Sequence, residues 1–156
     1  MNERDNSIGG VVNDAVARGV AILGLIGIAL IHVLEAPEAF AETLYLGLLF
    51  IGAIVASLVL AVALTRESDA RVWRVVGGLP ALILLCYVIS RAIGLPGFTS
   101  DVGEWTEPLG LASMVAEGLV VILSAAVLGE PMARAASATR SRQAPGAQPG
   151  TAAGLG

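Results

Sequence analysis

The sequence predicts an all-α integral membrane protein, a four-helix bundle with up-down-up-down order and both termini in the cytoplasm. Three observations lead to this fold class. The 156 residues are 56% hydrophobic and 14% charged, and their mean hydropathy of +0.81 lies far above that of soluble domains. Four apolar segments are each long enough to cross a bilayer. The nine basic residues, all arginine, gather in alternate connections between these segments.

The four expected spans cover about residues 17–35, 42–64, 73–95 and 108–129, within a bundle over residues 17–130. Each has roughly 20 residues, which a helix rising about 1.5 Å per residue needs to cross the hydrocarbon core. Residues 1–16 form a polar segment of mixed charge without the features of a signal peptide, so we expect the first span to be retained. Residues 131–156 are rich in Ala, Gly, Pro and Ser, which predicts a disordered cytoplasmic tail.

The arginines set the orientation, because basic residues in short loops stay on the cytoplasmic side. They precede the first span, lie between the second and third, and follow the fourth. The other two connections contain acids and no arginine: Glu35, Glu38 and Glu42 in the first, and Asp101, Glu104 and Glu107 in the second. We therefore expect a multi-pass protein of the bacterial cytoplasmic membrane, N-in and C-in, with an acidic outer face. Arg91 alone breaks the pattern.

The connection between the third and fourth spans contains several local signals. Gly94, Pro96 and Gly97 indicate a helix stop followed by a turn. Asp101 and Glu104 have the spacing of a capping box, which predicts a short interfacial helix carrying Trp105. Pro108 suits the first turn of a helix, and Glu107 just before it suits the helix dipole.

Two tryptophans lie near the expected boundaries, Trp73 at the inner one and Trp105 at the outer one. Amphipathic rings are common at this depth, so both are interpreted as interface anchors. Cys86 falls inside an apolar run and is expected to be a buried structural thiol, with no disulfide or cysteine-based zinc site possible in one chain. Small residues at four-residue spacing, such as Gly52 and Ala56, favour close helix packing.

Polar residues inside the spans are the candidate functional site. A charged side chain in a span costs at least ~2.5 kcal/mol at mid-helix and usually faces the bundle interior. His32, Arg91 and Glu117 are all expected in the outer half, where an Arg91–Glu117 pair is geometrically reasonable. Glu35 shares a helix face with His32, Ser90 adjoins Arg91, and Glu107 begins the fourth span. The predicted intramembrane polar cluster therefore comprises His32, Glu35, Ser90, Arg91, Glu107 and Glu117, beneath an outer acidic loop with Asp101 and Glu104.

Several motifs together resemble a group of small four-span bacterial membrane proteins without an established activity. These motifs are His32 and Glu35 at the end of the first span, SRAIGLPG at 90–97, EWTEPLG at 104–110, and an intramembrane Glu117. The resemblance covers roughly residues 20–128, and SRxxGLPG and EWxxPLG are its most specific parts. It supports the choice of residues and implies no mechanism.

Four interpretations of the polar cluster remain open at this point. It can be a structural network that fixes helix packing. His32, Glu35, Glu107 and Glu117 can instead bind a divalent cation or relay protons. Arg91 can instead bind the anionic group of a ligand or lipid. A Ser90–His32 dyad is conceivable, but no nucleophile elbow, HExxH motif or P-loop accompanies it.

From these alternatives we expect a non-catalytic accessory or scaffold subunit of a larger membrane complex, or a homo-oligomer. The alternative is a cation- or proton-binding carrier or channel component that uses the outer His, Arg and Glu residues. No cofactor is predicted: a divalent cation is possible, and bis-histidine haem is excluded within one chain by the single histidine. The expected partners are the lipid bilayer and other membrane subunits or a second copy, and no nucleic acid partner is expected.

Overall fold

The computed structural model describes the backbone of residues 3–143 and the side chains of residues 13–129, and this part of the chain is built from helices. Its four helices are α1 (Glu3–Glu42), α2 (Leu44–Arg66), α3 (Ala70–Ala92) and α4 (Pro108–Gln143). Each contains a stretch long and apolar enough to cross a membrane: Asn13–Glu42, Leu44–Arg66, Ala70–Ala92 and Pro108–Gly129. The all-α class and the four candidate spans are therefore as the sequence predicts.

The helix ends differ from the expected ones at several places. α1 continues through Glu35 and Glu38 to Glu42, and α2 begins after a single residue, Thr43, so the expected first loop is a sharp corner. Thr43 caps α2 by accepting a hydrogen bond from the Leu46 N–H at 3.4 Å. The helix thus extends beyond the expected span end near residue 35 and includes Pro37; alanine and glutamate, which also occur in residues 36–42, are good helix formers.

The two terminal segments are also more helical than the composition suggested. α1 begins at Glu3, inside the segment expected to lie before the bundle. α4 continues to Gln143, so residues 131–143 form helix where a disordered tail was expected. Alanine and arginine dominate this stretch and are strong helix formers, which outweighed its low apolar content. Residues 144–156 lie outside the described part, and the expectation for them is untested.

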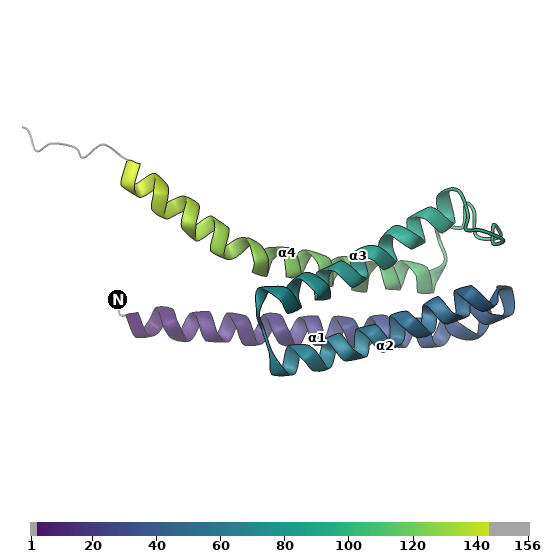
Figure 1. The fold of residues 1–156 in the computed structure, drawn as a ribbon, viewed down its shortest axis with the longest axis horizontal. Coiled ribbons are helices and arrows are strands. Elements are labelled where there is room, and N and C mark those ends of the chain that lie inside the picture. Colours follow the sequence, from purple (N-terminus) through teal and green to yellow (C-terminus); the bar gives the residue numbers. More distant parts are fainter. Residues whose placement is uncertain (1–2, 144–156) are drawn as a thin grey trace, which may run out of the picture.

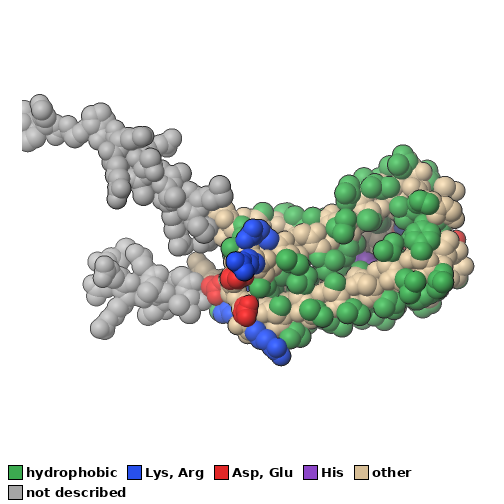
Figure 2. Space-filling model, viewed as in Figure 1, with side chains coloured by type: hydrophobic (Ala, Val, Ile, Leu, Met, Phe, Trp, Pro, Cys, Tyr) green, Lys and Arg blue, Asp and Glu red, His purple; other side chains and the backbone are tan. Residues whose placement is uncertain are grey.

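The helices associate as two hairpins, α1 with α2 and α3 with α4, joined by contacts between α1 and α4. Contact between α2 and α3 is less extensive than in these three pairs. Figure 1 shows α3 diverging from α2 toward the connection 93–107. The α1–α2 connection and residues 93–107 lie at one end of the molecule, here named the loop end, and the α2–α3 connection lies toward the other. Figure 2 shows a hollowed surface between the diverging helices.

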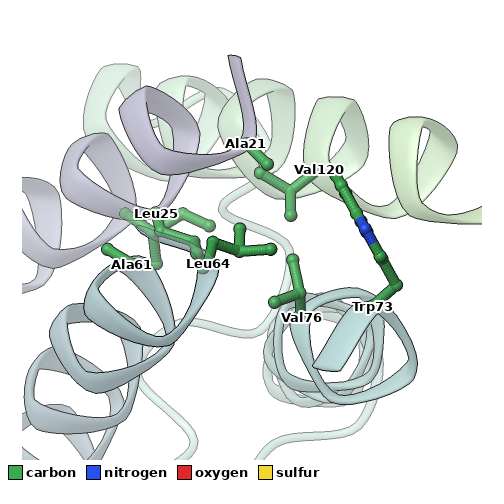
Figure 3. Packing of buried hydrophobic residues seen from close by; sticks show 8 residues of the cluster. Ala21, Leu25, Ala61, Leu64, Trp73, Val76 and Val120 are labelled. Atoms are coloured by element: carbon green, nitrogen blue, oxygen red, sulfur yellow. The ribbon is translucent and has the colours of Figure 1, made fainter. Parts of the chain in front are cut away.

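All four helices contribute to the hydrophobic core, which lies away from the loop end. Its buried members are Ala21, Leu25, Ile28, Ala61, Leu64, Trp73, Val76 and Val120. Figure 3 shows Leu64 of α2, Val76 of α3 and Val120 of α4 pointing into one space. Trp73, interpreted from the sequence as an interface anchor, is 1% exposed, so its ring packs inside the bundle. Its indole N–H donates to Ser68 Oγ at 3.2 Å, which satisfies the ring's polar atom inside the protein.

Most of the outer surface of the bundle is apolar. Large hydrophobic side chains such as Leu48, Val55, Leu82 and Ile122 are exposed along the spans. Charged side chains gather near the α2–α3 connection, while green hydrophobic groups cover the flank of the spans (Figure 2). Cys86 is a free thiol exposed on this surface, not the buried thiol that the sequence suggested. An apolar run identifies a membrane span but does not say which of its faces points inward.

Candidate functional site

Arg91 occupies the last turn of α3, where the helix is ended by its sequence. Ile93 and Gly94 both donate backbone hydrogen bonds to the Ile89 carbonyl, at 3.0 and 3.1 Å. Gly94 has φ +84°, a left-handed conformation that glycine adopts without steric cost. A tight turn follows, with reciprocal backbone hydrogen bonds between Leu95 and Phe98. The predicted Gly-Pro-Gly helix stop is confirmed.

The guanidinium of Arg91 binds two carboxylates from the following connection. Nη1 lies 2.5 Å from Asp101 Oδ2, and Nη2 donates to Glu107 Oε2. Arg91 is only 6% exposed, and its Cζ lies 5.2 Å from the centre of the Tyr87 ring, within cation–π range. The sequence made an Arg91–Glu117 pair geometrically reasonable without fixing the partner, and the acids that bind Arg91 are Asp101 and Glu107. We call these four residues, Tyr87, Arg91, Asp101 and Glu107, the Arg91 network.

The backbone of the connection folds back onto the end of α3. The Gly103 N–H donates to the Arg91 carbonyl at 2.9 Å, so Arg91 holds this segment through both its main chain and its side chain. The Tyr45 hydroxyl of α2 donates to the Pro96 carbonyl at 2.8 Å. The Trp105 ring meets Tyr87 edge to face, with centroids 6.4 Å apart. The connection is therefore a folded cap fastened to α2 and α3.

Asp101 and Glu104 do not begin a helix. Residues 99–106 form turns, with the Glu104 N–H bonded to the Asp101 carbonyl at 3.0 Å. The capping-box prediction was wrong because the Asp101 carboxylate binds Arg91 instead of free backbone N–H groups. Glu104 is exposed, as is Trp105 at 43%. Glu107 directly precedes α4 and Pro108 is its first residue, as the helix-start signals predicted.

Ser90 and His32 are buried on different helices and use partners in their own helices. Ser90 Oγ donates to the Tyr87 carbonyl at 2.8 Å. His32 Nδ1 lies 2.9 Å from the Ile28 carbonyl, and its ring packs at 5.0 Å from that of Phe50 in α2. Among the described hydrogen bonds none joins Ser90 to His32. The conceivable dyad is therefore not assembled.

Glu117 is buried separately from the Arg91 network. It is 1% exposed, and Ser113 one turn earlier in α4 donates to its Oε1 at 2.7 Å. Glu35 of α1 is half-buried.

The four candidate metal ligands do not gather into one site. Within the described part of the chain, no three His, Cys, Asp or Glu side chains come close enough together to hold an ion. His32 packs against Phe50, Glu107 binds Arg91, and Glu117 binds Ser113. The sequence placed these residues toward the outer end of the bundle, but His32, Glu107 and Glu117 have different partners.

Two participants, Tyr87 and Ser113, were missed from the sequence. Tyr87 lies four residues before Arg91, and Ser113 lies four residues before Glu117. This spacing stacks side chains on one helix face, so a search for polar or aromatic residues at i−4 would have found both. Asp101 was recognised as an acid of the loop but not as a partner of Arg91.

No protein-family model, curated protein or solved structure matches this chain. The resemblance carried by SRxxGLPG and EWxxPLG therefore stays a prediction, and the residues of the Arg91 network rest on geometry alone.

Proposed function

We propose that this chain is a non-catalytic accessory or scaffold subunit of a membrane assembly, or the protomer of a homo-oligomer. The pairing of charged side chains with one another at the loop end supports this proposal most directly. Arg91 is bound by two acids of its own chain. This pairing is typical of a structural cap, whereas an arginine that binds an anionic substrate would have its donors free for that substrate. The cap gives the loop end a defined surface that a partner can recognise.

We propose that a partner helix packs on the exposed face of α2 that carries Gly52. Gly52 of α2 is exposed, and nothing lies within 4 Å of a Cβ placed there. Small residues on such a face let helix backbones approach closely in lipid, where no hydrophobic force drives association. In the same hairpin Ser57 is fully buried, so only part of the small-residue pattern faces outward.

Purification in mild detergent followed by mass spectrometry tests the assembly. We expect a fixed set of co-purifying subunits or a discrete homo-oligomer. The variant Gly52→Phe should dissociate it, while Gly19→Phe, at an exposed and equally open position of α1, should not. A chain that stays monomeric in several mild detergents and captures no constant partner would contradict the proposal.

For the membrane topology we propose an up-down-up-down arrangement in the bacterial cytoplasmic membrane, with the loop end outside. Several acids and a single arginine, Arg91, lie near the loop end, whereas Arg66, Arg71 and Arg74 lie at or beside the opposite connection. This charge asymmetry is the one that the positive-inside rule describes. Both termini are then cytoplasmic.

Single cysteines introduced into a Cys86→Ser background test this orientation. In spheroplasts, an impermeant maleimide should label Ser100→Cys at once, and Glu67→Cys only after the membrane is permeabilised. Both positions are exposed. The reverse pattern of labelling would overturn the orientation but leave the four spans in place.

A second candidate function is a cation- or proton-binding carrier component. The burial of two titratable side chains, His32 and Glu117, inside candidate spans favours it, because such residues are costly in a membrane and often functional. The test is flux in proteoliposomes: Glu117→Gln should abolish proton or cation uptake that the unmodified chain supports. Equal flux through both proteins would end this candidate.

A further inference from the structure

Glu117 is the buried acid that the Arg91 network leaves unused. It is the tenth residue of α4, about 13 Å along the helix from Pro108. It is 1% exposed, and Val120, one turn further along, is fully buried. α1 packs closely here, since a Cβ placed on Gly24 would meet the Val120 side chain. The carboxyl group is therefore enclosed by protein within a candidate span.

Its one hydrogen-bond donor is neutral. Ser113 Oγ donates to Oε1 at 2.7 Å, and a hydroxyl can supply only a single O–H. Such a bond satisfies one lone pair of the carboxyl group but provides no positive charge. A carboxylate held by this partner alone would remain an unpaired charge in an apolar surrounding.

No cation in the described bundle reaches Glu117. Arg91 is the one arginine within residues 19–65 and 75–129. It binds Asp101 and Glu107. His32 of α1 faces the Ile28 carbonyl and the Phe50 ring. Neither Arg91 nor His32 therefore offers a positive charge to the Glu117 carboxyl group.

We propose that Glu117 is an intramembrane proton-binding site, with its carboxyl group held as the neutral acid and Ser113 as its hydrogen-bond partner. An unpaired charge inside a span is costly, and carrying a proton removes that cost. The site is independent of whether the chain assembles with partners.

Infrared spectroscopy of the full chain in liposomes near neutral pH tests the protonation state. We expect a C=O stretching band of a carboxylic acid that is lost in Glu117→Gln and retained in Glu38→Gln, a control at an exposed acid of α1. Ser113→Ala removes the hydrogen bond and should shift the band to higher wavenumber. A band unchanged by Glu117→Gln, or no carboxylic acid band in the unmodified chain, would overturn the proposal.

A second measurement uses the unmodified chain, so it does not depend on whether the variants fold. An apolar carbodiimide reacts with a protonated carboxyl: the acid proton moves to one reagent nitrogen while a carboxyl oxygen bonds to the central carbon. Acyl transfer from that oxygen to the other nitrogen then gives a stable N-acylurea, with no group lost. Peptide mass spectrometry should find this adduct at Glu117.

The control for this reaction is a second carbodiimide that is polar and stays in the water. A water-soluble carbodiimide with an added amine should modify exposed Glu38 in the same liposomes, which shows that carboxyl chemistry proceeds. Absence of the apolar adduct at Glu117 under these conditions would contradict the proposal. Failure of the scaffold proposal would instead appear in the purification experiment and would leave the infrared band and the adduct unchanged.

Discussion

Arg91 shows how one side chain organises an entire connection. Its guanidinium binds Asp101 and Glu107, its carbonyl accepts from Gly103, and its charge lies against the Tyr87 ring. Arginine suits this role because its planar group offers several fixed donors at once. The residue that broke the charge pattern of the sequence is thus neutralised by the acids that accompany it.

Replacing Arg91 with alanine should therefore loosen the cap. We expect a loss of about 2–4 kcal/mol in stability, since two charged hydrogen bonds disappear and two partly exposed acids are left facing each other. Arg91→Lys should recover only part of this, because one ammonium does not reproduce both contacts. Thermal unfolding in detergent micelles measures the effect.

Arg74→Ala provides the matched control. Arg74 also lies on α3 but is exposed, with its Nε bonded to the Ala70 carbonyl of its own helix. Its removal should change stability by no more than about 0.5 kcal/mol. Equal losses of stability in the two variants would show that the Arg91 network stabilises the protein no more than an exposed arginine does.

The two tryptophans give a second residue-scale prediction. Trp73 is enclosed in the core, so Trp73→Ala should cost about 3–5 kcal/mol through the cavity it leaves. Trp105 is 43% exposed and touches Tyr87 at one edge, so Trp105→Ala should cost about 1 kcal/mol. Tryptophan fluorescence of the two single-tryptophan proteins during unfolding measures both. A larger effect at Trp105 would argue against the packing of Trp73.

At the scale of the element, neighbouring glycines of one helix have different surroundings. A Cβ at Gly77 of α3 would lie 2.8 Å from the Ser124 Cβ of α4, whereas nothing lies within 4 Å of one at Gly78. Gly77 therefore sets how closely α3 and α4 approach. Because both residues are glycine, their hydropathy is the same and does not reveal which of them contacts α4.

Alanine at these positions should have opposite effects. Gly77→Ala forces the helices apart and should lose about 1–3 kcal/mol. Gly78→Ala meets open space and should gain up to about 1 kcal/mol from the better helix propensity of alanine. Denaturant titration of the chain in mixed micelles compares them. Similar destabilisation by both would contradict the close contact of α3 with α4.

At the scale of the whole molecule, the bundle is closed around the core and open between α2 and α3 toward the loop end (Figures 1 and 3). The core joins all four helices, so it fixes the bundle at one end. Near the other end the Arg91 network and the Tyr45–Pro96 bond hold the cap, with little direct packing of α2 on α3. Polar contacts thus replace apolar packing where the helices diverge.

The exposed face of α3 gives a prediction for the molecule in its membrane. Cys86 points outward from the bundle, so an apolar maleimide dissolved in the lipid should label it readily in liposomes. A water-soluble maleimide should label it roughly tenfold more slowly, because the surrounding surface is apolar and excludes water in the membrane. Labelling measured by mass spectrometry checks it. Cys86 resistant to both reagents in the isolated chain would mean that its helix face is covered.

The sequence by itself determined the helical class, the four candidate spans and the helix stop at Gly94, because these depend on the composition and local conformation of short segments. It also singled out Arg91 and Glu117, since a charge within an apolar run is visible without a structure. The tertiary structure decided which acids bind Arg91, that Trp73 lies inside and Cys86 outside, and that Ser113 is the hydrogen-bond partner of Glu117 among the described residues. Those outcomes depend on how each helix is rotated about its axis and on the fold of residues 93–107. In spans that are apolar on nearly every face, hydropathy carries little information about that rotation.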